Sequence, residues 1–129
     1  MSYDKLNEKI MDMQDEIIKA VQGCVRIDSV KAAPEEGAPY GKGCRAALDY
    51  ALKLGESLGF KTGTWVTVWV MWRFGERATR VVGVLGHLDV VPVGEGWTYP
   101  PLEQRSTTVN SMAVACRTIK DRPSVPSTD

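Results

Sequence analysis

The sequence predicts an α/β fold in which two amphipathic helices cover a few strands of a sheet. Two segments repeat apolar residues at helical spacing, and a third, Val81 to Leu85, is a run of apolar and mostly β-branched residues. Such a run is typical of a strand buried on both faces. With 129 residues, the chain is long enough for one small domain and too short for two sizeable ones. We therefore expect one α/β unit with the Val81–Leu85 strand at its centre.

The first expected helix runs from Asp4 to Gln22. Its apolar stripe, which we interpret as core packing, consists of Leu6, Ile10, Met13, Ile17 and Val21. Gly23 is the expected helix end, because glycine commonly follows a helix C-terminus. A short connection (25–30) follows, and then a glycine- and proline-rich loop (33–43) in which we expect Glu35 and Glu36 to be solvated.

The second expected helix covers Cys44 to Leu58, and Gly59 closes it. The residues of its apolar face are Ala47, Leu48, Ala51, Leu52 and Leu58. A strand should begin at Phe60–Thr62. Two regions fit this pattern poorly: the tryptophan-rich segment 64–73, which lacks clean alternation, and the tail after Pro101, which is polar and has little periodicity.

Composition narrows the classes of function. Lysine plus arginine and aspartate plus glutamate both number 16, so the charge predicts neither a nucleic-acid partner nor binding to an anionic membrane. The charged N-terminus is unlike a secretory signal, and the longest apolar run, 65–72, is far shorter than the ~20 residues of a membrane-spanning helix. The three cysteines, Cys24, Cys44 and Cys116, are an odd set without C-x-x-C spacing. We expect reduced thiols in a cytoplasmic protein.

The only histidine in the chain, His87, follows the apolar run and Gly86, and Asp89 stands two residues later. On an extended backbone both side chains point to the same side. A carboxylate at this spacing can steer the imidazole or accept its second N–H, as metal-binding histidines require. The strand end is also where open α/β sheets place ligand sites. A hydrogen-bonded histidine without any ligand is the alternative at this point.

Five segments, in order and at similar spacing, resemble the N-terminal part of the peptidase family M20 metallopeptidases, and most of all the PepV-like dipeptidases. They are R-I-D-S-V (26–30), A-P-Y-G-K-G (38–43), L-G-F-K-T (58–62), F-G-E (74–76) and G-H-L-D-V-V-P-V-G-E-G-W-T-Y-P-P (86–101). The resemblance implies that residues 1–101 are the N-terminal part of an M20 catalytic domain of the zinc-exopeptidase type, with an α/β fold, two zinc ions and an inserted smaller domain.

By resemblance, His87 is a metal ligand that binds one zinc, and Asp89 is the catalytic-site aspartate that orients it. The implied substrate is a dipeptide, hydrolysed by a water molecule that zinc activates.

The tail departs from the family, which has a G-R-G-x-x-D-D-K-G-P signature with a metal-bridging aspartate. Here Cys116 to Pro123 read C-R-T-I-K-D-R-P, so the bridging role is not transferred to Asp121. A catalytic zinc normally takes three protein ligands, and one histidine cannot hold a zinc pair. We therefore expect this chain to be inactive as a peptidase, and residues 102–129 to be an irregular tail.

A change of reading frame is our hypothesis for the tail. If the codons for 102–128 are read with two nucleotides skipped, synonymous codons permit G-R-G-M-P-D-D-K-G-P within one unbroken family-like run. Shorter shifts within 64–80 permit N-V, G-Y-V-E and G-D-E. The coding DNA decides this, because an alternate frame without family-like codons would contradict it.

A second class of function stays open at this point. The chain would then be a non-catalytic small domain that binds a partner or a single metal through His87. Zinc titration of the chain beside a His87→Ala variant distinguishes the two readings.

Overall fold

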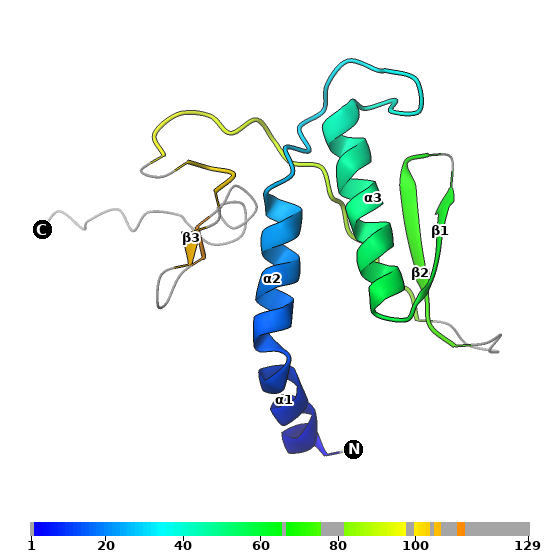
Figure 1. The fold of residues 1–129 in the computed structure, drawn as a ribbon, viewed down its shortest axis with the longest axis vertical. Coiled ribbons are helices and arrows are strands. Elements are labelled where there is room, and N and C mark those ends of the chain that lie inside the picture. The colour runs from blue at the N-terminus through cyan, green and yellow to red at the C-terminus, as the bar shows by residue number, and fades with distance from the viewer. Residues whose placement is uncertain are drawn as a thin grey trace, which may run out of the picture.

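The computed structural model describes residues 2–65, 67–75, 82–97 and 100–103, and the backbone of 105–106 and 111–112. In these residues the chain forms α1 (Tyr3–Asp12), α2 (Gln14–Val25), α3 (Lys42–Ser57), β1 (Lys61–Trp65), β2 (Trp69–Arg73), β3 (Arg105–Ser106) and β4 (Ser111–Met112). Strands β1 and β2 form one antiparallel pair, and β3 and β4 form another. Helix α3 lies between α2 and the β1–β2 hairpin (Figure 1). These helices and the two-stranded β1–β2 sheet are consistent with the predicted α/β class.

The first expected helix is broken in two. Met13 leaves the helical conformation with φ −88° and ψ 1°, and α2 then continues past the predicted end to Val25. The prediction that Gly23 ends the helix is wrong. Gly23 instead lies within α2 against the Tyr50 ring, where an added Cβ would be 2.7 Å from Tyr50 Cζ. Tyr50 Oη donates a hydrogen bond to Ala20 O at 2.8 Å, so this glycine allows α2 and α3 to approach closely.

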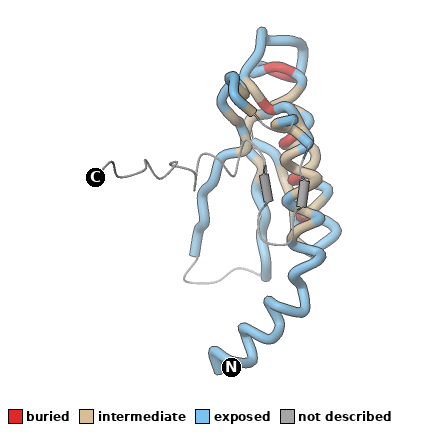
Figure 2. Tube along the Cα trace, turned by 90° about the vertical axis from the view of Figure 1, so that its left-hand side faces the viewer, coloured by how far each residue is buried: buried red, intermediate tan, exposed pale blue. Residues whose placement is uncertain are grey.

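The apolar stripe of the first two helices does not form a core. Leu6, Ile10, Met13, Ile17 and Val21 are each almost half exposed, and neither α1 nor α2 contains a buried residue. Figure 2 shows α1 exposed along its length and the buried residues gathered toward the other end of the molecule. Core packing was the wrong interpretation, because each of these side chains keeps almost half of its surface exposed.

Helix α3 agrees with its prediction to within two residues. Its inner face buries Ala47, Ala51 and Gly55, whereas Leu58 is half exposed. Gly59 has φ 82°, the left-handed conformation that glycine adopts without steric cost. Phe60 N–H donates to Gly55 O and Gly59 N–H donates to Glu56 O, both at 2.9 Å. These two bonds are the Schellman motif, and they end the helix at the predicted glycine.

The tryptophan-rich segment forms most of the β1–β2 hairpin, whose register pairs Lys61 with Arg73 and Trp65 with Trp69. The strand expected at Phe60–Thr62 is therefore present from Lys61. Trp72 lies on α3 at Gly55, and its ring centroid is 5.5 Å from that of Phe60. Poor packing was the expectation for this segment; it is wrong for Trp72, which is 39% exposed, and it holds for Trp65, which is 75% exposed.

The predicted central strand is absent from its described residues, 82–85. Val84 is 97% exposed, and Val82 and Leu85 are exposed as well. Beyond them, Val90 forms an isolated parallel bridge with Val30. A strand buried on both faces needs hydrogen-bonding neighbours and covering elements. For this segment, the described residues supply one bridge, between Val30 and Val90. The strands that pack against α3 are those of the β1–β2 hairpin.

The buried residues are few. Among the described residues, Ala38, Ala47 and Ala51 are the buried hydrophobic side chains, and Ser29 is the buried polar one. No described helix has the length and apolarity needed to cross a bilayer. Val81, residues 76–80 and most of the tail, including Cys116 and Asp121, lie outside the described residues. The division at residue 101 and the frame-shift hypothesis therefore stay predictions.

Candidate functional site

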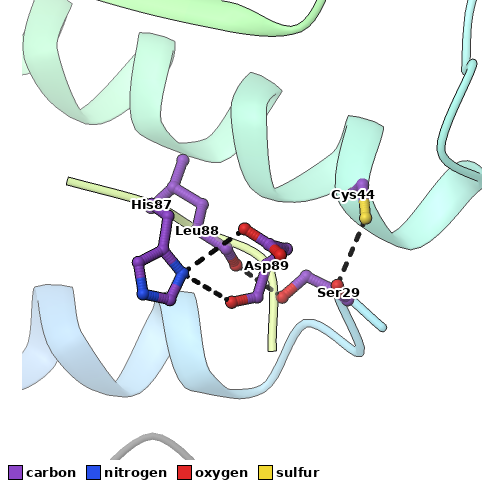
Figure 3. A network of polar contacts seen from close by, with 5 residues as sticks. All are labelled: Ser29, Cys44, His87, Leu88 and Asp89. Carbon is purple, nitrogen blue, oxygen red and sulfur yellow. Dashed lines mark hydrogen bonds and ion pairs between the residues drawn. The ribbon is translucent and has the colours of Figure 1, made fainter. Parts of the chain in front are cut away.

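His87 and Asp89 contact each other, as their spacing suggested. The Nδ1 atom of His87 lies 3.0 Å from the carbonyl oxygen of Asp89 and 3.3 Å from its carboxylate Oδ1 (Figure 3). Both side chains are open to solvent, at 82% and 66% exposure. The pair is therefore formed at the surface and is accessible to a ligand.

The two oxygen atoms beside Nδ1 favour the tautomer that carries its proton on Nδ1. In a neutral imidazole the other nitrogen, Nε2, then has a free lone pair that can accept a proton or bind a cation. A histidine that donates one ring N–H to a carboxylate or carbonyl oxygen is the arrangement found at metal ligands. The contact between His87 and Asp89 agrees with the expected geometry, and the metal-ligand role of His87 stays a prediction.

Ser29 joins this pair to the rest of the chain. It is 3% exposed, and its hydroxyl donates to Leu88 O at 2.7 Å. Its own carbonyl oxygen accepts the Val90 N–H at 3.3 Å and the Cys44 S–H at 3.2 Å (Figure 3). The sequence interpretation treated residues 25–30 as a connection and missed this role. The available signal was a small hydroxyl residue between Ile27 and Val30, in a segment that also belongs to the resemblance.

Cys44 is protonated at neutral pH. Burial raises the pKa of its thiol, and the negative charges of Asp89 and Asp28 raise it further. The thiol therefore stays a donor to the Ser29 carbonyl. Cys24 is also a free thiol, and burial raises its pKa. Cys116 lies outside the described residues, so the expectation of reduced thiols stays a prediction.

A cavity of about 650 Å³ adjoins the pair. One wall is the segment 84–89, which includes His87 and Asp89. The facing walls come from Cys44 and Leu48 of α3 and from residues 68–70 of the hairpin, and Lys31 and Tyr40 also line it. The space is mostly apolar, and His87 and Asp89 are among the residues that line it. Pockets with this combination of surfaces are typical of small-molecule sites.

The described residues supply only part of a metal site. Nowhere in the described ranges do three or more histidine, cysteine, aspartate or glutamate side chains converge to hold a metal ion. His87 offers one nitrogen ligand, and Asp89 offers the carboxylate beside it. This donor set fits one ligand of a zinc site together with its orienting group, and falls short of the three protein ligands of a catalytic zinc.

Comparison with known proteins shows which proteins this chain is similar to. No family model matches it. Over 98 residues it is 38% identical to a protein named "Putative dipeptidase" from Staphylococcus aureus strain USA300, and equally to proteins of that name from strains NCTC 8325 and COL. The chain is related to these proteins named putative dipeptidases. The alignment covers 74% of this chain and 21% of each relative, so the chain spans about a fifth of the length of these curated relatives.

Proposed function

We propose that this chain carries part of the catalytic domain of a zinc-dependent dipeptidase of peptidase family M20, of the PepV-like type. The observation that carries the proposal is the His87–Asp89 contact, with Nδ1 engaged and Nε2 available. The relationship to dipeptidases and the five family-like segments support the same reaction class, hydrolysis of the peptide bond of a dipeptide.

His87 would bind one zinc ion through Nε2. Asp89 would hold the proton on Nδ1 and fix the plane of the ring. Zinc in such a site supplies a water molecule of lowered pKa and polarises the scissile carbonyl. The apolar cavity beside the pair has room for side chains of a small substrate.

We also propose that this chain by itself does not hydrolyse dipeptides. The reason lies in the donor set, since the described residues bring one imidazole together with one carboxylate. Zinc held by one nitrogen ligand binds weakly and is poorly positioned for catalysis.

A zinc titration by calorimetry, with the full chain and three variants, tests the proposal. We expect weak binding in the wild type, loss of binding in His87→Ala, and weaker binding in Asp89→Asn. Asp49→Asn is the matched control, because its carboxylate pairs with Arg45 at 2.8 Å on α3 and should leave zinc affinity unchanged.

The results of the titration distinguish the proposed function from its alternatives. Zinc binding that survives His87→Ala contradicts the ligand role of His87. Hydrolysis of a dipeptide panel by the zinc-loaded chain at enzyme-like rates contradicts the proposed inactivity. Tight binding that is lost in His87→Ala, without hydrolysis, favours a single-metal binding domain over a peptidase part.

A further inference from the structure

We propose that Ser29 is a positioning residue for the His87–Asp89 pair and fixes the backbone on both sides of Asp89. The inference rests on the proposed function for the role of the pair, but its geometry is independent of any metal. Among the described residues, the hydrogen bonds of Ser29 join it to Leu88, Val90 and Cys44, and His87 is not among its partners. It acts through the main chain of residues 88–90.

The first anchor lies before Asp89. The Ser29 hydroxyl donates to the carbonyl oxygen of Leu88 at 2.7 Å. A peptide unit is planar, so a hydrogen bond that orients the Leu88 carbonyl also orients the amide of Asp89. This bond therefore restricts how residue 89 enters the site.

The second anchor lies after Asp89. The Val90 N–H donates to the carbonyl oxygen of Ser29 at 3.3 Å. The Val90 amide and the Asp89 carbonyl belong to one peptide plane, so this bond sets the direction of the Asp89 carbonyl oxygen. That oxygen is the one 3.0 Å from His87 Nδ1. One residue thus orients both peptide planes of Asp89, and through them the imidazole.

Ser29 is itself firmly held. It is buried, and Cys44 of α3 donates its S–H to the Ser29 carbonyl at 3.2 Å. Gly43 of the same helix turn has no side chain, and an added Cβ would collide with the Asp28 carbonyl oxygen. These contacts connect the start of α3, through Ser29, to the His87–Asp89 pair.

The site segment, residues 82–97, is largely exposed in the described part of the structure. Val84, Leu85 and Val91 are exposed, and Val90 makes an isolated bridge rather than a strand. A segment with few buried contacts depends on its hydrogen bonds for its conformation. The loss of the Ser29 hydroxyl should therefore disturb the pair more than it disturbs the helices.

Nuclear magnetic resonance on the full chain gives a direct test, because the Hε1 proton of its single histidine produces one unambiguous imidazole signal. In Ser29→Ala without metal, we expect this signal to move toward its position in the urea-unfolded chain. We expect zinc affinity to fall about 2- to 10-fold, the usual range for one hydrogen bond. Ser29→Thr, which keeps the hydroxyl, should restore both readouts.

Ser57→Ala is the matched control, because the Ser57 hydroxyl also donates to a backbone carbonyl, Leu54 O, at 2.8 Å, but at the far end of α3. It should leave both readouts unchanged. An unmoved imidazole signal in Ser29→Ala, or an equal change in Ser57→Ala, would overturn the proposal. If the wild type binds no zinc, the metal role of His87 fails, while the metal-free imidazole signal still decides the role of Ser29.

A second pair of variants applies if Ser29→Ala loses the helical circular dichroism of the wild type. Cys44→Ala removes the donor to the Ser29 carbonyl, and Cys44→Ser retains one. A moved imidazole signal in Cys44→Ala that returns in Cys44→Ser supports the positioning role. Identical signals in both variants and the wild type contradict it.

Discussion

The α3–hairpin region, Lys42 to Arg73, and the site segment, 82–97, are held in place by different forces. In the first, α3 buries Ala47 and Ala51, Trp72 lies against Gly55, and the rings of Phe60 and Trp72 contact each other in a tilted arrangement. In the second, the chain is largely exposed, and the hydrogen bonds of one serine tie residues 88–90 to the rest. One region is stabilised by packing and the other by directed polar contacts.

This difference separates stability from the geometry of the site. Apolar burial contributes in proportion to area and is indifferent to direction, whereas a hydrogen bond fixes an orientation at a small net gain in free energy. Substitutions in α3 and the hairpin should therefore change the free energy of unfolding. Substitutions around Ser29 should change the imidazole environment with a smaller effect on unfolding.

The largest effect on stability is expected from Trp72→Ala. Truncation of a fully buried tryptophan costs about 3–5 kcal/mol. Trp72 is 39% exposed, so we expect a loss of about 2 kcal/mol. The measurement is urea unfolding followed by circular dichroism. The control is Trp65→Ala, since Trp65 is 75% exposed and should cost much less. Equal losses in the two variants would show that the hairpin does not pack on α3 as described.

A smaller loss, about 1 kcal/mol, is expected from Gly43→Ala. The added methyl would collide with the Asp28 carbonyl oxygen, and overpacking costs about 1–3 kcal/mol, partly offset by the better helix propensity of alanine. Gly63→Ala is the control, because no atom lies within 4 Å of its added Cβ. Gly43→Ala should also move the His87 imidazole signal, since it displaces Asp28 and Ser29 from α3. If Gly43→Ala is as stable as the wild type and its imidazole signal is unmoved, the proposed connection between α3 and the site is contradicted.

The smallest effect is a loss of stability at alkaline pH. Burial raises the pKa of both Cys24 and Cys44, and the charges of Asp89 and Asp28 add to the effect at Cys44. The folded chain then binds more protons than the unfolded one once the pH exceeds the unfolded thiol pKa of about 8.5. The contribution to stability is complete below that pH and is lost as the pH rises through the folded pKa values.

Urea unfolding between neutral and alkaline pH measures this slope. Cys44→Ser lacks the titrating thiol, so its free energy of unfolding should decline less steeply than that of the wild type. A decline of equal steepness would mean that Cys44 does not titrate differently in the folded chain.

Local patterns in the sequence predicted the features that neighbouring residues determine. Gly59 ends α3 because only a few residues are needed to form its left-handed turn and two hydrogen bonds. The His87–Asp89 contact likewise depends on a spacing of two residues. These features follow from short-range geometry, and so the sequence alone was enough for them.

The tertiary structure decided the features that depend on distant partners. The apolar run before His87 has the composition of a buried strand, but composition cannot supply the neighbouring strands that burial requires, and its described residues are exposed. Gly23 has the local character of a helix end, yet it lies inside α2 beside the Tyr50 ring of the distant helix α3. Ser29 lies 59 residues from Leu88 in the chain, so their hydrogen bond became visible only in three dimensions. The sequence by itself determined the pair that forms the candidate site; the fold determined which residue holds that pair in place, because only the fold brings residues 29, 44 and 88 together.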